Sequence, residues 1–254
     1  MIKFFRKIRY DLMEKNKTGK YFKYAIGEIV LVVIGILIAL QINNWNDNRK
    51  NKITEADYYC RILDDFEFNE KLIDETSELT TNKIKLCKKL MLDLNKIPND
   101  RSTILNDFVA VLRQDVFVPS AITFDDLTSS GQLKLLRDIK LKNRLIEHST
   151  FINNTLNLLQ ENRNEIIKRM GNIEFISEFG FQDIDYLKQE LDEEHLALLP
   201  EKNWTNDPTD PIFLKFQDNL VFFIAMLIRQ KQHLSNLKKE MQEPLKLLKN
   251  KNCQ

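Results

Sequence analysis

The segment from Tyr24 to Trp45 constrains this chain most, because it is apolar enough to cross a membrane. Between Ile29 and Leu40 it holds ten Ile, Leu or Val residues, one Gly, one Ala and no charge. As an α-helix, the residues from Tyr24 to Ile42 reach roughly 28 Å, close to the hydrocarbon thickness of about 30 Å. The gain from the apolar residues outweighs the cost of Glu28, which lies near one end. The sequence therefore predicts a transmembrane helix over residues 24–45.

The basic arm before this segment sets the predicted orientation. Residues 1–23 hold eight Lys or Arg against Asp11 and Glu14, whereas four basic residues fall in the twenty positions after Trp45. Positive charges beside a span stay in the cytoplasm, so we expect the N-terminus inside and about 200 residues outside. A cleavable signal peptide is disfavoured, because the basic and apolar regions are both long and no small-x-small site follows. A basic arm of this kind indicates a membrane surface and not nucleic acid as its partner.

Apolar residues alternate with basic ones in this arm, as they do in a short helix lying at a membrane interface. The residues expected at the interface are Lys3, Arg6, Lys7, Arg9, Tyr24 and Trp45. The basic side chains would meet anionic headgroups, and the two aromatic residues would mark the ends of the span. The alternative is a basic tail that acts only as a topology signal.

One face of the predicted span carries Glu28, Gly35 and Ala39. Small residues four apart let two helices approach closely in lipid, where packing drives association. This face is the expected contact with a second copy or with the span of a partner, and Glu28 would accept a hydrogen bond there. The alternative is that Gly35 and Ala39 face lipid while Glu28 reaches the cytoplasmic headgroups near Lys23.

Two blocks of the sequence carry a resemblance to a known family. The first comprises FFRKIR at Phe4–Arg9, YAIGEI at Tyr24–Ile29 and VIGILIALQINNWN at Val33–Asn46, and the second is FDDLTSSGQL at Phe124–Leu133. These blocks resemble an uncharacterised family of small single-span, membrane-anchored proteins from Bacteroidota, catalogued as a domain of unknown function. The resemblance implies a location in the cell envelope of a diderm bacterium. It implies no activity and no catalytic residue.

The residues after the span predict a bundle of helices. Six Gly and six Pro are few for 254 residues, and long stretches repeat apolar residues at helical spacing. We expect the span to continue as a helix towards Leu94, with a break or sharp bend near residues 76–81. Further helices are expected around residues 104–112, 123–130, 141–170, 184–199 and 211–244, with uncertain breaks near 171–182. The prediction is an all-α protein with a basic cytoplasmic arm (1–23), a transmembrane helix (24–45) and an extracytoplasmic helical bundle (46–254).

The ends of these helices carry specific expectations. Ser120 or Thr123 is expected to cap the helix that follows Pro119, and Gly131 to end it in a left-handed conformation. The last helix shows a coiled-coil-like seam of apolar residues at intervals of three and four from Phe213 to Met241. Its most apolar part, residues 220–228, is too short to cross a bilayer and is expected in the middle of the bundle. Pro244 should kink or end this helix, and the basic tail at residues 246–251 should fray.

The three cysteines are expected to be free thiols. In an unbroken helix Cys60 and Cys87 would be about 40 Å apart, whereas a disulfide needs a Cα separation below about 7 Å. Their pairing would require a hairpin between them. Cys253 lies near the end that is expected to fray, and the odd number of cysteines argues against a disulfide framework.

No catalytic or metal-binding constellation is visible in the sequence. The histidines, His148, His195 and His233, lie on separate segments, and no HExxH motif, CxxC pair or Gly-rich phosphate loop occurs. His148 falls on an apolar helix face, where a hydrogen-bonded core histidine is expected. Asp192 and His195 share a helix face, but such a pair is common by chance. We therefore expect no enzyme, no cofactor and no metal.

The function expected from these features is interaction or scaffolding at the bacterial inner membrane. The protein would hold a periplasmic helical domain beside the bilayer for an envelope protein partner or a second copy. The loop at residues 201–211, with Trp204 as its one large anchor, is where we expect a partner contact, because loops often carry function. The alternative is a sensory or ligand-binding module. It would signal through a partner membrane protein, since only the short arm lies inside.

Overall fold

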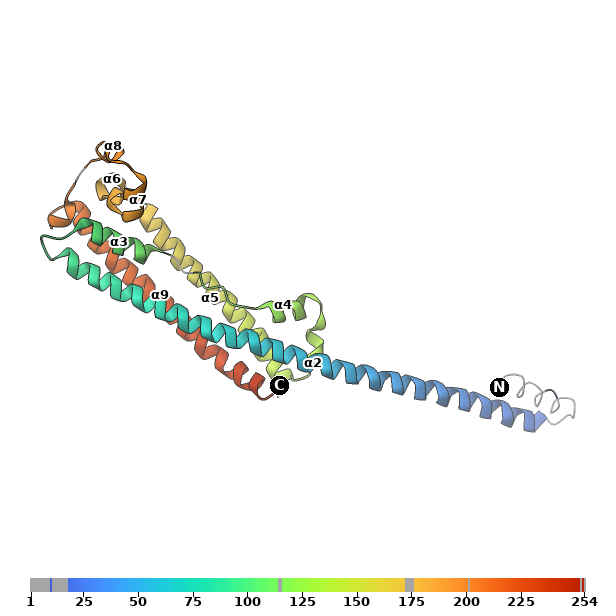
Figure 1. Ribbon diagram of the computed structural model, residues 1–254. Helices are drawn as coiled ribbons and strands as arrows, with labels where there is room; N and C mark the ends of the chain where they lie inside the picture. The colour runs from blue at the N-terminus through green and yellow to red at the C-terminus, as the bar shows by residue number, and fades with distance from the viewer. Residues whose placement is uncertain are drawn as a thin grey trace. The chain divides into compact units, whose positions relative to one another are not determined.

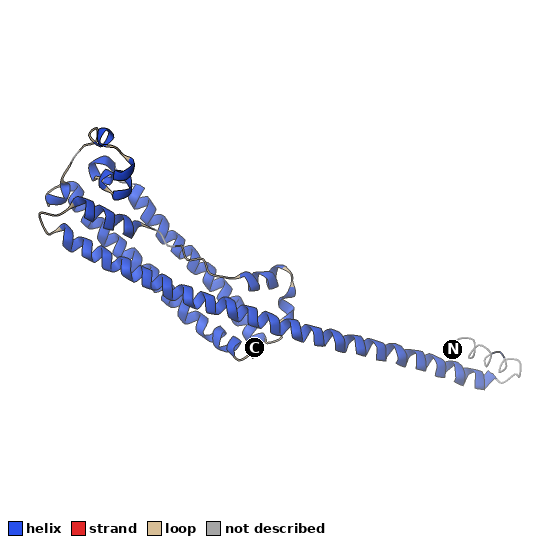
Figure 2. Cartoon of the chain, in the orientation of Figure 1, coloured by secondary structure: helices blue, strands red, loops and turns tan. Residues whose placement is uncertain are grey.

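The computed structural model describes Tyr10 and residues 18–113, 116–171, 176–200, 202–251 and 253. All regular structure in these residues is helical, and none of them forms a strand (Figure 2). In chain order the elements are α2 (Thr18–Leu94), α3 (Arg101–Leu112), α4 (Ile122–Ser129), η1 (Gln132–Leu135), α5 (Ile139–Gly171), α6 (Ile176–Phe179), η2 (Phe181–Asp183), α7 (Asp185–Glu190), α8 (Glu193–Leu196), η3 (Trp204–Asn206) and α9 (Pro211–Lys249) (Figure 1). The predicted all-α class is confirmed. The chain divides into two compact units, Met1–Asp57 and Tyr58–Gln254.

The part of α2 in the first unit leaves its apolar side chains uncovered. The Ile, Leu and Val residues between Ile29 and Leu40 are 47% to 68% exposed. So large a contiguous apolar surface is unfavourable in water and calls for an apolar environment or a partner. In the described part of the chain, two helices, the part of α2 from Phe22 onward and α9, are long and apolar enough to cross a membrane. No residue in the most apolar stretch of α2 is buried, whereas 33% of the most apolar stretch of α9 is buried.

The predicted break near residues 76–81 is wrong, because α2 continues to Leu94. The hydroxyl groups of Thr76 and Thr80 donate to the carbonyl oxygens of the residues four positions earlier, each at 2.7 Å. Thr81 donates to Ser77 in the same way at 2.8 Å. Because these hydroxyl groups find acceptors in the backbone of α2 itself, the polar residues interrupt the apolar stripe but not the helix.

Two hydrophobic clusters form the core of the second unit. The first joins α2, α5 and the C-terminal part of α9, and its side chains include Tyr59, Ile62, Phe66, Leu141, Leu145, Ile152, Leu237 and Met241. The second joins α2, α3 and the N-terminal part of α9, and includes Leu90, Leu94, Leu105, Phe108, Phe216 and Phe223. α5 and α9 pack along each other (Figure 1). The helices expected around residues 104–112 and 141–170 are thus present as α3 and α5.

The seam predicted on α9 faces this core. Phe213, Phe216, Leu220, Phe223, Leu227, Leu234, Leu237 and Met241 are all buried. The helix does not end at Pro244, and the expectation of a frayed tail is also wrong, because α9 runs to Lys249. Leu245 and Leu248 are 4% and 0% exposed in the first cluster. Their packing offsets the hydrogen bond that Pro244 cannot donate inside a helix.

At the start of α4, side chains of α2 form the hydrogen bonds to the backbone. Ser120 and Thr123, which were expected to cap this helix, do not. Its N-cap residue, Ala121, makes no side-chain cap bond. Instead, the Asp65 carboxylate accepts hydrogen bonds from the Thr123 amide at 3.1 Å and from the Ser120 hydroxyl at 2.5 Å. Asn69 exchanges two hydrogen bonds with the Ser120 backbone, at 2.7 and 2.8 Å. At the other end Gly131 has φ +69°, the predicted left-handed conformation.

The single helix expected at residues 184–199 is instead two short helices, α7 and α8. Leu191 between them is extended, with φ −93° and ψ 121°. Asp192 then caps α8 by accepting a hydrogen bond from the His195 amide at 2.9 Å. An Asp side chain that bonds the backbone three residues ahead starts a new helix in place of continuing the previous one.

Candidate functional site

The residues predicted at the membrane interface are only partly described. Lys3, Arg6, Lys7 and Arg9 lie outside the described residues. Tyr24 and Trp45 lie on α2 and are 54% and 67% exposed. The Arg49 guanidinium lies over the Trp45 ring, 5.9 Å from its centroid. Both aromatic side chains are therefore free to meet a bilayer interface, and their role there stays a prediction.

The predicted contact face of the span is open along α2. A Cβ atom added at Gly35 would meet nothing within 4 Å. Ala39 is also exposed, while Glu28 is half-buried. The first unit thus leaves room for a second helix to approach Gly35 closely. Whether a partner span occupies this face stays a prediction.

Trp204, the expected anchor for a partner, is a core residue. Its side chain is 1% exposed, and its indole N–H donates to the Phe179 carbonyl at 2.8 Å. Its ring centroid lies 5.2 Å from those of both Phe179 and Phe216. Burial of this large apolar ring fastens the loop to the second cluster, so Trp204 itself does not offer a surface to a partner.

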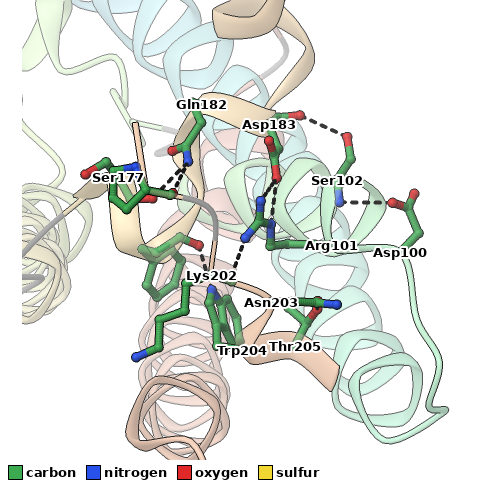
Figure 3. A network of polar contacts seen from close by, with 12 residues as sticks. Asp100, Arg101, Ser102, Ser177, Gln182, Asp183, Lys202, Asn203, Trp204 and Thr205 are labelled. Carbon is green, nitrogen blue, oxygen red and sulfur yellow. Dashed lines mark hydrogen bonds and ion pairs between the residues drawn. The ribbon is translucent and has the colours of Figure 1, made fainter. Parts of the chain in front are cut away.

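The polar network in Figure 3 holds the same loop against α3. The Arg101 side chain is 12% exposed; its Nε donates to the Asp183 carboxylate at 2.6 Å, and it also donates to the Lys202 carbonyl. The Ser102 hydroxyl donates to the Asp183 carbonyl at 2.9 Å. Asp100 caps α3, and the hydrogen bond from the Thr103 hydroxyl lowers the pKa of its carboxyl group. These groups bond one another, so the network is structural and holds η2 and the loop residue Lys202 against α3.

A disulfide between Cys60 and Cys253 fastens the C-terminal tail to α2, with the two Cα atoms 5.3 Å apart. The expectation of three free thiols is therefore wrong for these two. Cys87 is free and buried, and burial raises the pKa of its thiol to about 11. The sequence contained a signal for this pairing. Leu234, Met241 and Leu248 recur every seven residues, so the apolar seam of α9 continues beyond Pro244 and indicates that the helix does too. A helix that continues so far returns the tail towards the start of the second unit.

Polar contacts surround the disulfide. The Lys251 ammonium donates to the Asp138 carboxylate at 2.6 Å and lies 4.9 Å from the centroid of the Tyr59 ring. The Asp138 amide donates to the Tyr59 hydroxyl at 3.3 Å. Hydrogen bonding from the Leu141 amide, followed by Lys251, lowers the pKa of the Asp138 carboxyl group. We call Tyr59, Cys60, Asp138, Lys251 and Cys253 the clasp.

A charged cluster lies between α5 and α9, where the sequence predicted a core histidine. His148 is 6% exposed, and its Nδ1 is hydrogen-bonded to the Glu240 carboxylate. Arg144 donates to the other oxygen of Glu240 at 3.0 Å and forms an ion pair with Glu243 at 3.1 Å. The Phe66 ring lies 4.5 Å from that of His148. The expected hydrogen-bonded core histidine is confirmed, but Glu240 was not identified from the sequence.

A small cavity of about 70 Å³ adjoins His148 and the Asp65 and Asn69 side chains. Asp65 and Asn69 are already engaged by Ser120 and Thr123, so this cavity offers few unused polar groups. The His195 ring is hydrogen-bonded to Asp192, at 2.5 Å, in the cap of α8. Within the described ranges, no three His, Cys, Asp or Glu side chains come together as a metal site.

The fold and the clasp define an all-α protein in which an uncovered apolar helix precedes a disulfide-fastened helical unit. Residues 28–143, somewhat less than half of the chain, match the model of a family described as a family of unknown function (DUF6090). The matched region includes Cys60, Asp65, Asn69, α4 and Asp138. The resemblance to a family of unknown function is confirmed to that extent. No curated protein and no solved structure matches the chain.

Proposed function

We propose that this protein is a single-pass inner-membrane protein of the bacterial envelope whose second unit lies in the periplasm. The disulfide between Cys60 and Cys253 carries this proposal, because such bonds persist in oxidising compartments and are rare in the cytosol. The uncovered apolar surface of residues 29–40 supports a membrane span. The excess of basic residues before this segment supports a cytoplasmic N-terminus. The disulfide and the basic residues both favour an extracytoplasmic location for the residues after the span.

The task that these features support best is scaffolding: the protein presents a helical domain beside the membrane to a protein partner. Leu214, Val221 and Ile228 recur every seven residues on α9 and are 45% to 55% exposed. Side chains seven apart lie in one row on a helix, and an exposed aliphatic row favours contact with a helix of another protein. The buried seam of the same helix contacts the core, so α9 has two apolar faces.

Photo-crosslinking in intact cells tests the scaffold. A photoreactive amino acid at Val221, in the exposed row, should give a discrete adduct with one protein, which mass spectrometry identifies. The same amino acid at Lys231, an exposed polar position of α9, is the matched control. Equal labelling at both positions, or no adduct at Val221 in cells that contain the protein, would contradict partner binding through this row.

A second candidate function is a sensory module that signals through a partner membrane protein. The observation that favours it is the continuity of α2, a single helix from Thr18 to Leu94 that contributes side chains to both clusters of the second unit. A change in the packing of those clusters could then move the span. A ligand-dependent rise in melting temperature would favour this function over the scaffold.

A further inference from the structure

A second cavity, of about 250 Å³, lies among α5, α9 and the segment between α3 and α4. Its apolar wall is formed mainly by Val116, Phe117, Leu156 and Leu159. Among the described residues that line it, Arg163 is the one charged residue and none is acidic. The volume approaches the range of about 300–1,000 Å³ that is usual for small-molecule sites, which are mostly apolar with a few polar groups.

Arg163 is unlike the other two arginines of α5. Arg144 pairs with Glu240 and Glu243, and Arg169 pairs with Asp218. In the described part of the chain, no hydrogen bond or ion pair joins Arg163 to another residue. Its Nε atom, like that of Arg144, is buried without a hydrogen-bond partner, but the Arg144 Nε atom still lies 3.1 Å from the Glu243 carboxylate. A buried guanidinium N–H without a hydrogen-bond partner in the protein is unfavourable, so such a group requires an explanation.

A ligand with one carboxylate supplies what Arg163 lacks. The guanidinium presents parallel N–H donors whose spacing matches the two oxygens of a carboxylate. The apolar wall would cover the rest of such a ligand. Of the amide side chains that also line the cavity, Gln160 and Gln230 already donate to Asn164 and Thr80, so a phosphate would find few further donors there. We propose that this cavity binds a small monocarboxylate with an apolar body and that Arg163 pairs with its carboxylate. This proposal goes beyond the scaffold and does not depend on the orientation of the chain in the membrane.

Binding of para-fluorobenzoate to the full-length protein in lipid nanodiscs tests this site. Fluorine NMR measures its dissociation constant, with para-fluorobenzyl alcohol as the uncharged analogue and empty nanodiscs as the baseline for partition into lipid. We expect the carboxylate to bind at least about tenfold more tightly than the alcohol, the effect of one favourable ion pair. Arg163→Gln should remove this preference. Lys168→Gln, which removes an exposed charge of the same helix, should leave it unchanged.

A variant outside the helices keeps the test decisive if Arg163→Gln fails to fold. Val116 is 60% exposed beside the cavity, so Val116→Trp can narrow the cavity without disturbing the core, and it should also weaken binding. Circular dichroism establishes that each variant is folded. Equal affinity for the acid and the alcohol, or no binding of the acid to folded protein, would overturn the proposal. So would an unchanged affinity in folded Arg163→Gln.

Discussion

Cys60 and Cys253 are 193 positions apart in the sequence and bonded in the structure. The bond joins the start of the second unit on α2 to the tail that follows α9, so almost the whole unit lies within one covalent loop. A cross-link across so long a loop restricts the unfolded chain strongly, and removing a native disulfide typically costs about 2–5 kcal/mol.

We therefore predict that Cys60→Ser lowers the free energy of unfolding of the second unit by about 2–5 kcal/mol. Denaturant titration of the full-length protein, followed by circular dichroism, measures this change. A reducing agent should produce a similar loss in the unmodified protein and no further loss in the variant. A stability that responds to neither treatment would show that the tail is not fastened by this bond.

The second prediction concerns the orientation of the chain in the membrane. A reporter that is active only outside the cytoplasm should be active when fused after Gln254, because the basic residues retain the N-terminal arm inside. The same reporter fused after Lys23, before the span, should be inactive. Cytoplasmic activity of a complementary reporter at Gln254 would refute the proposed location of the second unit.

The third prediction concerns association of the span. Gly35→Ile should weaken it in a membrane two-hybrid assay, because a large side chain would hold apart two helices that meet at Gly35 and Ala39. Ile36→Ala is the control, since Ile36 lies about 100° around the helix from Gly35. Equal and negligible effects of the two changes would leave the span as an anchor only.

The fourth prediction concerns the charged cluster between α5 and α9. Glu240→Gln should lower stability by about 1–3 kcal/mol, because it removes the charge that pairs with Arg144 and contacts buried His148. Glu243→Gln is the matched control: its side chain is half exposed, and it should cost less than about 1 kcal/mol. Thermal unfolding measures both changes. Equal losses would mean that burial of Glu240 does not strengthen its contacts.

The fifth prediction concerns the dependence of the clasp on pH. The pKa of Asp138 is lowered in the folded state, first by the Leu141 amide and then by Lys251. The Asp138 carboxylate therefore stabilises the fold above its ordinary pKa, and this contribution is lost as the pH falls through the lower, folded value. Asp138→Asn should destabilise the protein at neutral pH and have little effect in strong acid. Equal destabilisation at both pH values would point to packing in place of charge.

Patterns within single segments predicted much of the fold. The uninterrupted apolar run identified the candidate span, and recurrence at intervals of three and four identified α5 and the buried face of α9. Gly131 identified the end of α4. Each inference depends on residues a few positions apart, where backbone geometry alone decides which side chains share a face.

Contacts between distant segments were not predicted, and the candidate site depends on them. Asp65 satisfies the start of α4, the indole of Trp204 bonds Phe179, and Glu240 meets His148. Arg163 gives no local sign that it lacks a carboxylate partner among the described residues, because Glu161 and Glu165 lie two positions on either side of it in the sequence.

The sequence by itself determined that α5 and α9 are helices and which face of α9 is apolar. Only the tertiary structure decided that Cys253 reaches Cys60, that Trp204 is buried, and that Arg163 borders a cavity and has no ion-pair partner among the described residues. The physical reason is that local periodicity sets the direction of a side chain from its own helix axis. The group that the side chain meets depends on the packing of helices whose residues lie far apart in the chain.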